Sequence, residues 1–224
     1  MTRRTSGIAR SLVLALLFLA GNGGPAPAQG PSPQFLQFVQ GKPNRDAVEQ
    51  AVRGQIAGWP GGCSQVAVSP KFDLIVLQRP EVAADGRSLL AGVWKEAVEA
   101  TACGVTRVHN ILNVVEKGEI HRLPMLVGTS HADIMLQRDA APLFFMGASR
   151  LVAQDCKRNY VTDTRFVALQ GPEIPKAKAG PKSRAWREEW TLWSCGKEIV
   201  VPIRFTPDAT GTAISVLHVE VRQK

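Results

Sequence analysis

The alternation of hydrophobic and polar residues predicts one helix followed by several strands, and it predicts this order twice. In the first half, Val48, Val52 and Ile56 recur at helical spacing. Apolar residues then occupy every second position from Phe72 to Val76, the period of a strand with one buried face. In the second half, positions 143–152 are rich in apolar residues, which predicts a second and more hydrophobic helix.

Capping and breaking residues suggest where these elements begin and end. Asn44 is a candidate N-cap for the first helix, and Asp139 is one for the second. Pro142 would then fall in the first turn, where proline is tolerated. Pro80 and Pro172 are predicted to end the first strand of each half, because proline cannot donate to a strand ladder.

A second strand in each half carries a tryptophan and a glutamate two residues apart. These are Trp94 and Glu96 in the first half, and Trp186 and Glu188 in the second. Side chains two residues apart share one face of a strand, so each glutamate lies beside an indole. A Cys-Gly pair then predicts a turn, and two further strands are expected in each half, over 105–115 and 120–127, and over 197–205 and 213–221.

The two halves also match in sequence. An Arg-Asp-Ala triplet, a cysteine, a Leu-Gln pair and a Trp-x-Glu followed by Cys-Gly recur in one order, at offsets of 93 or 92 residues. Such self-similarity indicates a tandem duplication. We expect an α+β fold built from two modules, residues 43–133 and 134–224, each with a helix and an antiparallel sheet of about four strands.

The four cysteines are expected to form disulfides. Four cysteines allow three pairings. Only Cys63–Cys103 with Cys156–Cys195 keeps each bond inside one repeat, so we favour that pairing. Each bond closes a loop of about 40 residues, for which chain entropy gives at most roughly 4 kcal/mol of stabilisation.

The first 28 residues have the pattern of a secretory signal. Three arginines precede a nine-residue apolar stretch, Leu12–Ala20, which is too short to span a bilayer. An A-x-A pattern predicts cleavage near Ala28. The Arg3-Arg4 pair leaves open whether export uses the general or the twin-arginine route. Residues 29–42 are rich in Pro and Gln and are predicted to be a flexible leader.

Charge and hydropathy limit the partners of the mature chain. The net charge is +8, and removing the three arginines of the signal leaves 24 basic and 19 acidic residues, a net charge of +5. This is below the charge density of a nucleic-acid-binding protein. No later stretch has the roughly 18 apolar residues of a membrane helix. We therefore expect a periplasmic or secreted protein with no nucleic-acid partner and no transmembrane anchor.

The Trp-x-Glu-x-Trp pattern at 186–190, followed by Cys195-Gly196, resembles a motif of exported bacterial proteins whose activity is uncharacterised. The resemblance extends over residues 186–212 and, with fewer matches, over 94–112. It carries no activity, cofactor or partner with it.

Glu96 and Glu188 are the first candidate site residues. A carboxylate in a partly dry site beside tryptophan has a raised pKa and can act as an acid or base. The alternative is structural, with each glutamate paired to an arginine or a backbone N–H. We favour the structural interpretation, because both halves keep the glutamate while its surroundings differ.

The returning strands differ in polarity, which gives a second candidate site. One face is apolar in the second half (Ile199, Val201, Ile203, Phe205), whereas the aligned face in the first half is largely polar (Arg107, His109, Ile111, Asn113). A simple Cys-Gly hairpin places His109 opposite Val98 and diagonal to Glu96. Glu96 and His109 are then candidate catalytic residues, with Arg107 and Asn113 as binding residues. Alternatively, this face points to solvent and Val108, Leu112 and Val114 form the core side.

The third candidate is a basic loop. It contains no acidic residue and comprises Lys176, Lys178, Lys182, Arg184 and Arg187. Such a loop can bind an anionic envelope component or another envelope protein. The alternative is a loop that only increases solubility.

Catalytic and metal-binding motifs are missing from the sequence. There is no G-x-S-x-G, S-x-x-K or H-E-x-x-H, and the histidines and acids near 121–133 are scattered, so we expect no metal and no cofactor. We expect a secreted, non-catalytic envelope binding or assembly protein that acts through its module surfaces. The alternative is a small periplasmic hydrolase or isomerase in which Glu96 is the base. A third hypothesis is an inhibitor of an exported enzyme.

Overall fold

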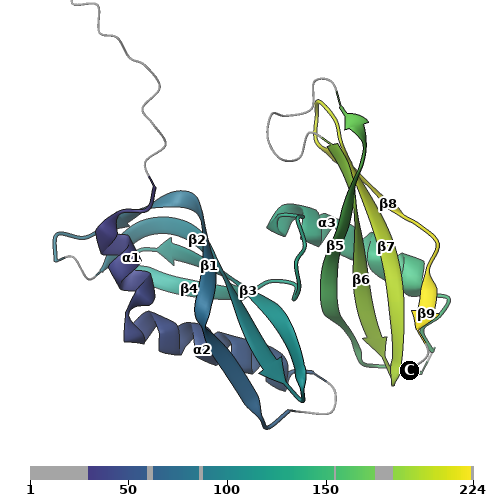
Figure 1. Ribbon diagram of the computed structural model, residues 1–224, viewed down its shortest axis with the longest axis horizontal. Helices are drawn as coiled ribbons and strands as arrows, with labels where there is room; N and C mark the ends of the chain where they lie inside the picture. The colour runs from purple at the N-terminus through teal and green to yellow at the C-terminus, as the bar shows by residue number, and fades with distance from the viewer. Residues whose placement is uncertain (1–29, 60–62, 86–87, 154, 175–183, 223–224) are drawn as a thin grey trace, which may run out of the picture. The chain divides into compact units, whose positions relative to one another are not determined.

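The protein consists mostly of antiparallel sheet. The computed structural model describes residues 30–59, 63–85, 88–153, 155–174 and 184–222. Within these ranges the chain forms three helices and two antiparallel sheets (Figure 1). The predicted signal, residues 1–28, lies outside the described residues.

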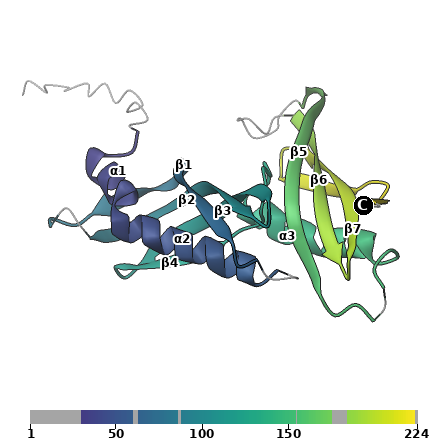
Figure 2. The ribbon, with the colours of Figure 1, turned by 60° about the horizontal axis from the view of Figure 1, so that its bottom comes forward.

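The first sheet has four strands and is covered on one face by two helices (Figure 1). Its strand order follows the chain: β1 (Val66–Val82), β2 (Leu89–Ala102), β3 (Val105–Glu116) and β4 (Glu119–Pro124). The helices are α1 (Pro33–Gln40) and α2 (Lys42–Ala57), and α2 runs along the sheet as Figure 2 shows.

The second sheet repeats the order of the first and adds one short strand. Helix α3 (Ile134–Ala148) precedes β5 (Asn159–Glu173), β6 (Arg184–Ser194), β7 (Lys197–Pro207) and β8 (Thr212–Val216), which pair in that order. The additional strand β9 (Glu220–Arg222) pairs with β7 beside β8.

Helix α1 occupies most of residues 29–42, which the sequence predicted to be a flexible leader. The structure shows a packed helix there instead. The Ser32 hydroxyl caps it by accepting a hydrogen bond from the backbone N–H of Phe35 at 3.2 Å. Phe35 and Val39 are fully buried, and the Phe35 ring lies 5.2 Å from the Trp94 ring in an edge-on contact. Burial of this apolar face stabilises a helix that would be marginal in isolation.

The helices begin earlier than the capping residues predicted. Helix α2 starts at Lys42, and Asn44 is buried in its first turn instead of capping it. Helix α3 is capped by Asp133, whose carboxylate accepts from the N–H of Leu136 at 3.0 Å, so Asp139 is not the cap. Pro142 therefore lies in the helix interior.

The first strands also extend beyond the prolines that were predicted to end them. Pro80 lies within β1 and Pro172 within β5. Both are edge strands in their sheets, so one side of each strand has no ladder partner that would require an N–H.

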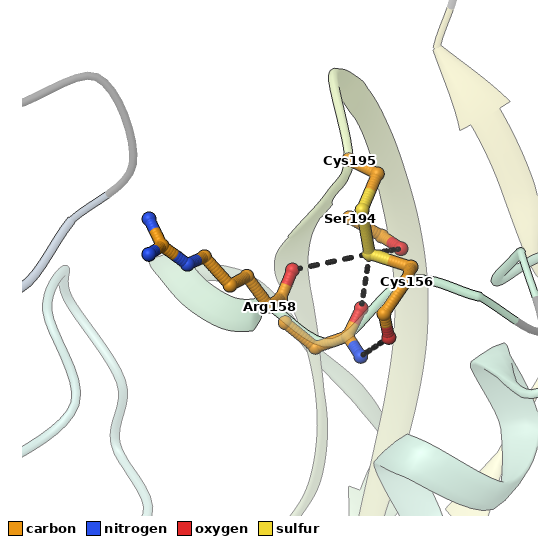
Figure 3. Close-up of a disulfide and its surroundings, with 5 residues drawn as sticks. Cys156, Arg158, Ser194 and Cys195 are labelled. Carbon is orange, nitrogen blue, oxygen red and sulfur yellow. Dashed lines mark hydrogen bonds between the residues drawn. A yellow bond between two sulfur atoms is a disulfide. The ribbon is translucent and has the colours of Figure 1, made fainter.

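The Cys-Gly pairs form the same turn in both sheets. Cys103 and Gly104 have φ of 49° and 76°, and Cys195 and Gly196 have φ of 45° and 87°. Two successive positive φ values characterise the type I′ turn, whose twist matches that of paired strands. Each turn cysteine is disulfide-bonded, Cys103 to Cys63 and Cys195 to Cys156, with Cα atoms 5.8 Å apart in both bonds. The structure thus has the pairing that the sequence repeat favours, and Figure 3 shows Ser194 beside the second bond.

Residues 125–132 connect β4 to α3 and form hydrogen bonds with strands of both sheets. Gly128 donates its N–H to the Val108 carbonyl on β3 at 2.7 Å. Thr129 donates to the Thr164 carbonyl on β5 at 2.6 Å. Gly128 has a φ of 110°, and a Cβ at this position would overlap the Thr164 backbone. The connection therefore requires glycine for both its conformation and its close approach.

Each sheet packs its helix-facing side into an aromatic core. In the second sheet, Trp186 stacks on Phe205 with ring centroids 4.9 Å apart, and Trp190 contacts Phe144 of α3. In the first sheet, Trp94 packs under α1, and Val48, Val52 and Ile56 of α2 meet the rest of the sheet. None of the described helices combines the length and apolar character needed to cross a bilayer.

Candidate functional site

Glu188 lies on β6 under the start of α3, and it is fully buried. Its carboxylate accepts from two backbone N–H groups, those of His131 at 2.8 Å and Ala132 at 3.1 Å. The Ser130 hydroxyl donates to it at 2.7 Å. The indole N–H groups of Trp186 and Trp190 each donate at 2.8 Å, so both carboxylate oxygens are well supplied with donors. We call these six residues the Glu188 site.

Glu96 occupies the matching position on β2 and is also fully buried, but its partners differ. Its Oε1 accepts from the Trp94 indole at 3.0 Å, from the Asn44 amide at 3.1 Å and from the Asn113 amide at 3.3 Å. Its Oε2 lies 3.7 Å from Arg45 Nη1, beyond hydrogen-bonding distance. A carboxylate and an arginine thus meet at the start of α2. We call Glu96, Trp94, Asn44, Asn113 and Arg45, together with Arg122, the Glu96 site.

The Glu96 site contains buried polar atoms that form no hydrogen bond. Among the described residues these are Glu96 Oε2, Arg45 Nη1, Asn113 Oδ1 and Arg122 Nε. Arg122 uses another nitrogen to donate to Asn44 Oδ1 at 2.9 Å, and burial lowers its pKa while Glu96 opposes that shift. Unpaired buried polar groups cost stability, so this site is less completely satisfied than the Glu188 site.

His109 lies on the same sheet face as Glu96, and the predicted register is confirmed. The structure pairs His109 with Val98 and Glu96 with Ile111. The face points toward the helices, because His109 and Asn113 are buried, so the alternative of a solvent-facing strand surface is not observed. The first sheet therefore buries polar side chains where the second buries Ile199, Val201, Ile203 and Phe205.

His109 belongs to a second group of side chains, distinct from the Glu96 site. Its Nδ1 lies 2.8 Å from Gln55 Oε1. Gln55 donates its amide to the Met125 carbonyl at 2.8 Å, which fixes the amide so that its oxygen faces the imidazole. His109 Nδ1 therefore carries the proton and donates it. The imidazole stacks on Trp59 with centroids 5.6 Å apart, and the Arg107 guanidinium lies 5.3 Å from the same indole.

Burial and charge hold His109 in its neutral form. The pKa of His109 is lowered from 6.5 to about 4, mainly because burial removes the imidazole from water and in smaller part because the Arg107 guanidinium is nearby. No hydrogen bond joins His109 to Glu96 among the described residues. The structure thus brings Glu96 and Asn113 together and groups His109 with Arg107 separately.

The basic loop is described only in part. Lys176, Lys178 and Lys182 lie outside the described residues. Arg184 donates to the Gly171 carbonyl at 2.7 and 3.0 Å, which closes the base of the loop. Arg187 lies 3.7 Å from Glu189 on the exposed face of β6.

The sequence patterns missed several residues that complete these sites. Asn44 was interpreted as a cap, and Arg45 only as a repeat landmark. Ser130, His131 and Ala132 lie in a connecting segment with no periodicity, so no local pattern pointed to Glu188.

Comparison with known proteins does not assign the chain to a family. No family model, no curated protein and no solved structure matched it.

Proposed function

We propose that the two helix–sheet arrangements arose by duplication of one module, 43–133 and 134–224. The strand order, the disulfide position and the Cys-Gly turn are the same in both. A further parallel lies at the helix starts. Asn44 donates its amide to the carbonyl five residues earlier, at 3.1 Å, and Gln137 does the same at 3.0 Å.

We further propose that the protein is a non-catalytic binding or assembly protein of the cell envelope. The observation that carries this proposal is the burial of Glu96 and Glu188, the two carboxylates at equivalent positions. Glu96 accepts a hydrogen bond from the first turn of α2, and Glu188 accepts hydrogen bonds from the residues just before α3, so each carboxylate connects a helix start to a sheet. A carboxylate in this role braces the fold and is not presented to a substrate.

Two disulfides are typical of proteins that fold outside the cytoplasm. Together with the signal-like residues 1–28, they support export to the periplasm or the medium. In that compartment the basic loop is the strongest candidate contact surface, and its proposed partner is an anionic envelope component. Clustered lysines contribute about 1 kcal/mol each near an anionic lipid surface.

Vesicle flotation tests this proposal. The purified protein is expected to bind phosphatidylglycerol vesicles and not phosphatidylcholine vesicles. Replacing Lys176, Lys178 and Lys182 with Ser should weaken binding by roughly a hundredfold, since three contributions of about 1 kcal/mol add to about 3 kcal/mol.

The matched control removes the same charge elsewhere. Lys71, Lys157 and Lys197 are exposed and lie on other segments, so their triple replacement by Ser should leave most of the binding intact. Equal losses in the two triple variants would show that only net charge matters, and the basic loop would then be abandoned as the contact surface.

The alternative function, a small periplasmic hydrolase or isomerase, is favoured by one observation. Among the described residues, four of the five buried side-chain atoms without a hydrogen bond lie in the Glu96 site, and the fifth, Arg187 Nε, lies next to Glu188 in sequence. Unsatisfied buried polar groups occur where a site is built for chemistry. Glu96 would act as the base. Arg107 and His109 would then hold an anionic substrate.

Glu96→Gln separates this alternative from the first proposal. Gln keeps an acceptor for Trp94 and Asn44, so the variant is expected to fold. Turnover of a panel of ester, amide and phosphate substrates by the wild type, abolished in the folded variant, would establish the enzyme. Turnover that Glu96→Gln leaves unchanged would eliminate Glu96 as the base.

A further inference from the structure

Strand β1 forms an open edge of the first sheet. It pairs with β2 along one side, and no described residue forms a main-chain hydrogen bond with the other side. The equivalent strand β5 differs, because Thr129 donates its N–H to the Thr164 carbonyl at 2.6 Å and Gly128 forms a bridge with the same residue. The chain therefore covers part of its own edge in the second sheet and leaves the edge of the first sheet open.

The exposed side chains of β1 follow a symmetrical order around Val76. Ile75 and Leu77 flank it and are 46 % and 59 % exposed. Leu77 has no partner in β2, because the register shifts between Val76 and Gln78. Two charged side chains of opposite sign follow on each side, and in chain order these are exposed Lys71, Asp73, Arg79 and Glu81.

These four charges form no ion pair with a described residue. One of them has a weaker interaction within its own sheet: burial lowers the pKa of Lys95 on β2, and the Asp73 carboxylate opposes that shift. Lys71, Arg79 and Glu81 have no such interaction among the described residues. The edge thus presents an apolar centre between charges that are free to meet a partner.

A second copy of the chain matches this order. When two β1 edges pair antiparallel about a two-fold axis at Val76, Ile75 of one copy lies opposite Leu77 of the other. The charges then meet with opposite signs, in the pairs Asp73 with Arg79 and Lys71 with Glu81. Apolar pairs and opposite charges directly across two strands are stabilising. Each contact occurs twice, because a two-fold interface uses the same surface on both copies.

Other registers lack this complementarity. Moving the axis by one residue toward the N-terminus places Lys71 opposite Arg79, and moving it by one residue toward the C-terminus places Asp73 opposite Glu81. Both are pairs of like charge, which are destabilising. Natural proteins place charges on an exposed edge to prevent pairing with other strands. The charges of β1 prevent the shifted registers and favour the one centred on Val76.

Strand β5 does not have the same symmetry, although it is the matching strand of the repeat. The equivalent two-fold pairing, about Ala168, places Asp163 opposite Glu173, again a pair of like charge. Arg165 is paired within the chain, to Glu189 on β6 at 2.6 Å. The self-complementary edge is therefore a property of the first sheet and not of the repeated fold.

We propose that the protein forms a two-fold dimer through β1, which joins the four-stranded sheets of two copies into one continuous antiparallel sheet. Addition of a strand to an open edge gains main-chain hydrogen bonds, and the side chains determine which strand is accepted. This inference goes beyond the proposed envelope function and does not rest on it.

Exchange of one charge pair tests the register. Lys71→Glu and Glu81→Lys each bring like charges together twice in the dimer, so each should raise the dimer dissociation constant by roughly tenfold or more in sedimentation equilibrium. The double variant carries opposite charges again and should regain the wild-type constant. Losses that add up in the double variant would overturn the proposal.

Leu77→Glu tests the apolar centre and is expected to give a monomer. Leu169 occupies the same place in the repeat on β5 and is 43 % exposed, so Leu169→Glu is the matched control and should leave the dimer intact. Circular dichroism checks that both variants fold, and the charge exchange above tests the same edge without changing its apolar residues. A wild type that stays monomeric at every concentration, or equal effects of the two leucine variants, would overturn the proposal.

An extended segment from elsewhere in the same chain is the competing occupant of this edge. Amide hydrogen exchange separates the two cases. In a dimer, protection of the β1 amides rises with protein concentration and is lost in Leu77→Glu. Protection that is independent of concentration in a monomeric protein would assign the edge to the chain itself and overturn the dimer.

Discussion

The buried histidine on β3 makes stability depend on pH in a defined window. The pKa of His109 is about 4 in the folded protein, against 6.5 for an unperturbed histidine, because burial and then Arg107 disfavour the charged form. Between these two values the unfolded chain binds the proton and the folded chain does not. Stability therefore rises with pH across the window and is lost as the pH falls from 6.5 toward 4.

The size of the effect follows from the same two values. At about pH 4.5 an unfolded histidine is almost wholly protonated, whereas His109 in the folded protein is largely neutral. The linkage relation then gives a loss of about 2 kcal/mol in unfolding free energy between about pH 7 and pH 4.5. This is a large share of the 5–15 kcal/mol by which typical domains are stable.

The assay compares urea unfolding of the wild type and His109→Asn at both pH values. Asn keeps an N–H close to the position of Nδ1 for Gln55 and does not titrate. The variant loses packing, which lowers its stability by a similar amount at each pH. The wild type should lose about 2 kcal/mol more than the variant on acidification. Equal losses in the two proteins would refute the reasoning, because His109 would then titrate as it does in water.

The remaining predictions concern the glutamates and the connecting segment. In chemical denaturation, Glu188→Gln should lower the unfolding free energy by about 2 kcal/mol more than Glu96→Gln does. At position 188 the new amide would turn an N–H toward buried donors, whereas Glu96 has one oxygen without a hydrogen bond that the amide can replace. Equal losses in the two variants would contradict this difference. Gly128→Ala should lower the thermal midpoint strongly, whereas Gly118→Ala, also at positive φ but with open space around it, should cost only about 1 kcal/mol. Similar losses at the two glycines would show that the Thr164 contact does not matter.

Hydrophobic periodicity located most strands, because side chains on a half-buried strand must alternate wherever the strand lies. The Cys-Gly turn predicted the pairing of His109 with Val98, since a two-residue turn fixes the register of a hairpin. The helix starts were less well predicted. Asn44 and Asp139 are both acceptable caps by type, yet Gly41 and Asp133 hold those positions. Several nearby residues can cap a helix, and tertiary packing selects one of them.

Helix α1 shows how a weak local pattern gains its structure from distant contacts. Phe35, Phe38 and Val39 lie at helical spacing after Ser32-Pro33, but the segment has only eight residues and is surrounded by Pro and Gln. A helix this short is not stable alone. Packing against Trp94, more than fifty residues away, stabilises it.

By itself, the sequence determined the repeated order of elements, the two turns and the disulfide pairing that the repeat favours, because each depends on residues close together or on copies of one pattern. Only the tertiary structure decided that Glu96 and Glu188 have different surroundings and that His109 is buried as a neutral donor. These properties depend on distances and burial between segments far apart in the chain, which residue type and spacing do not encode.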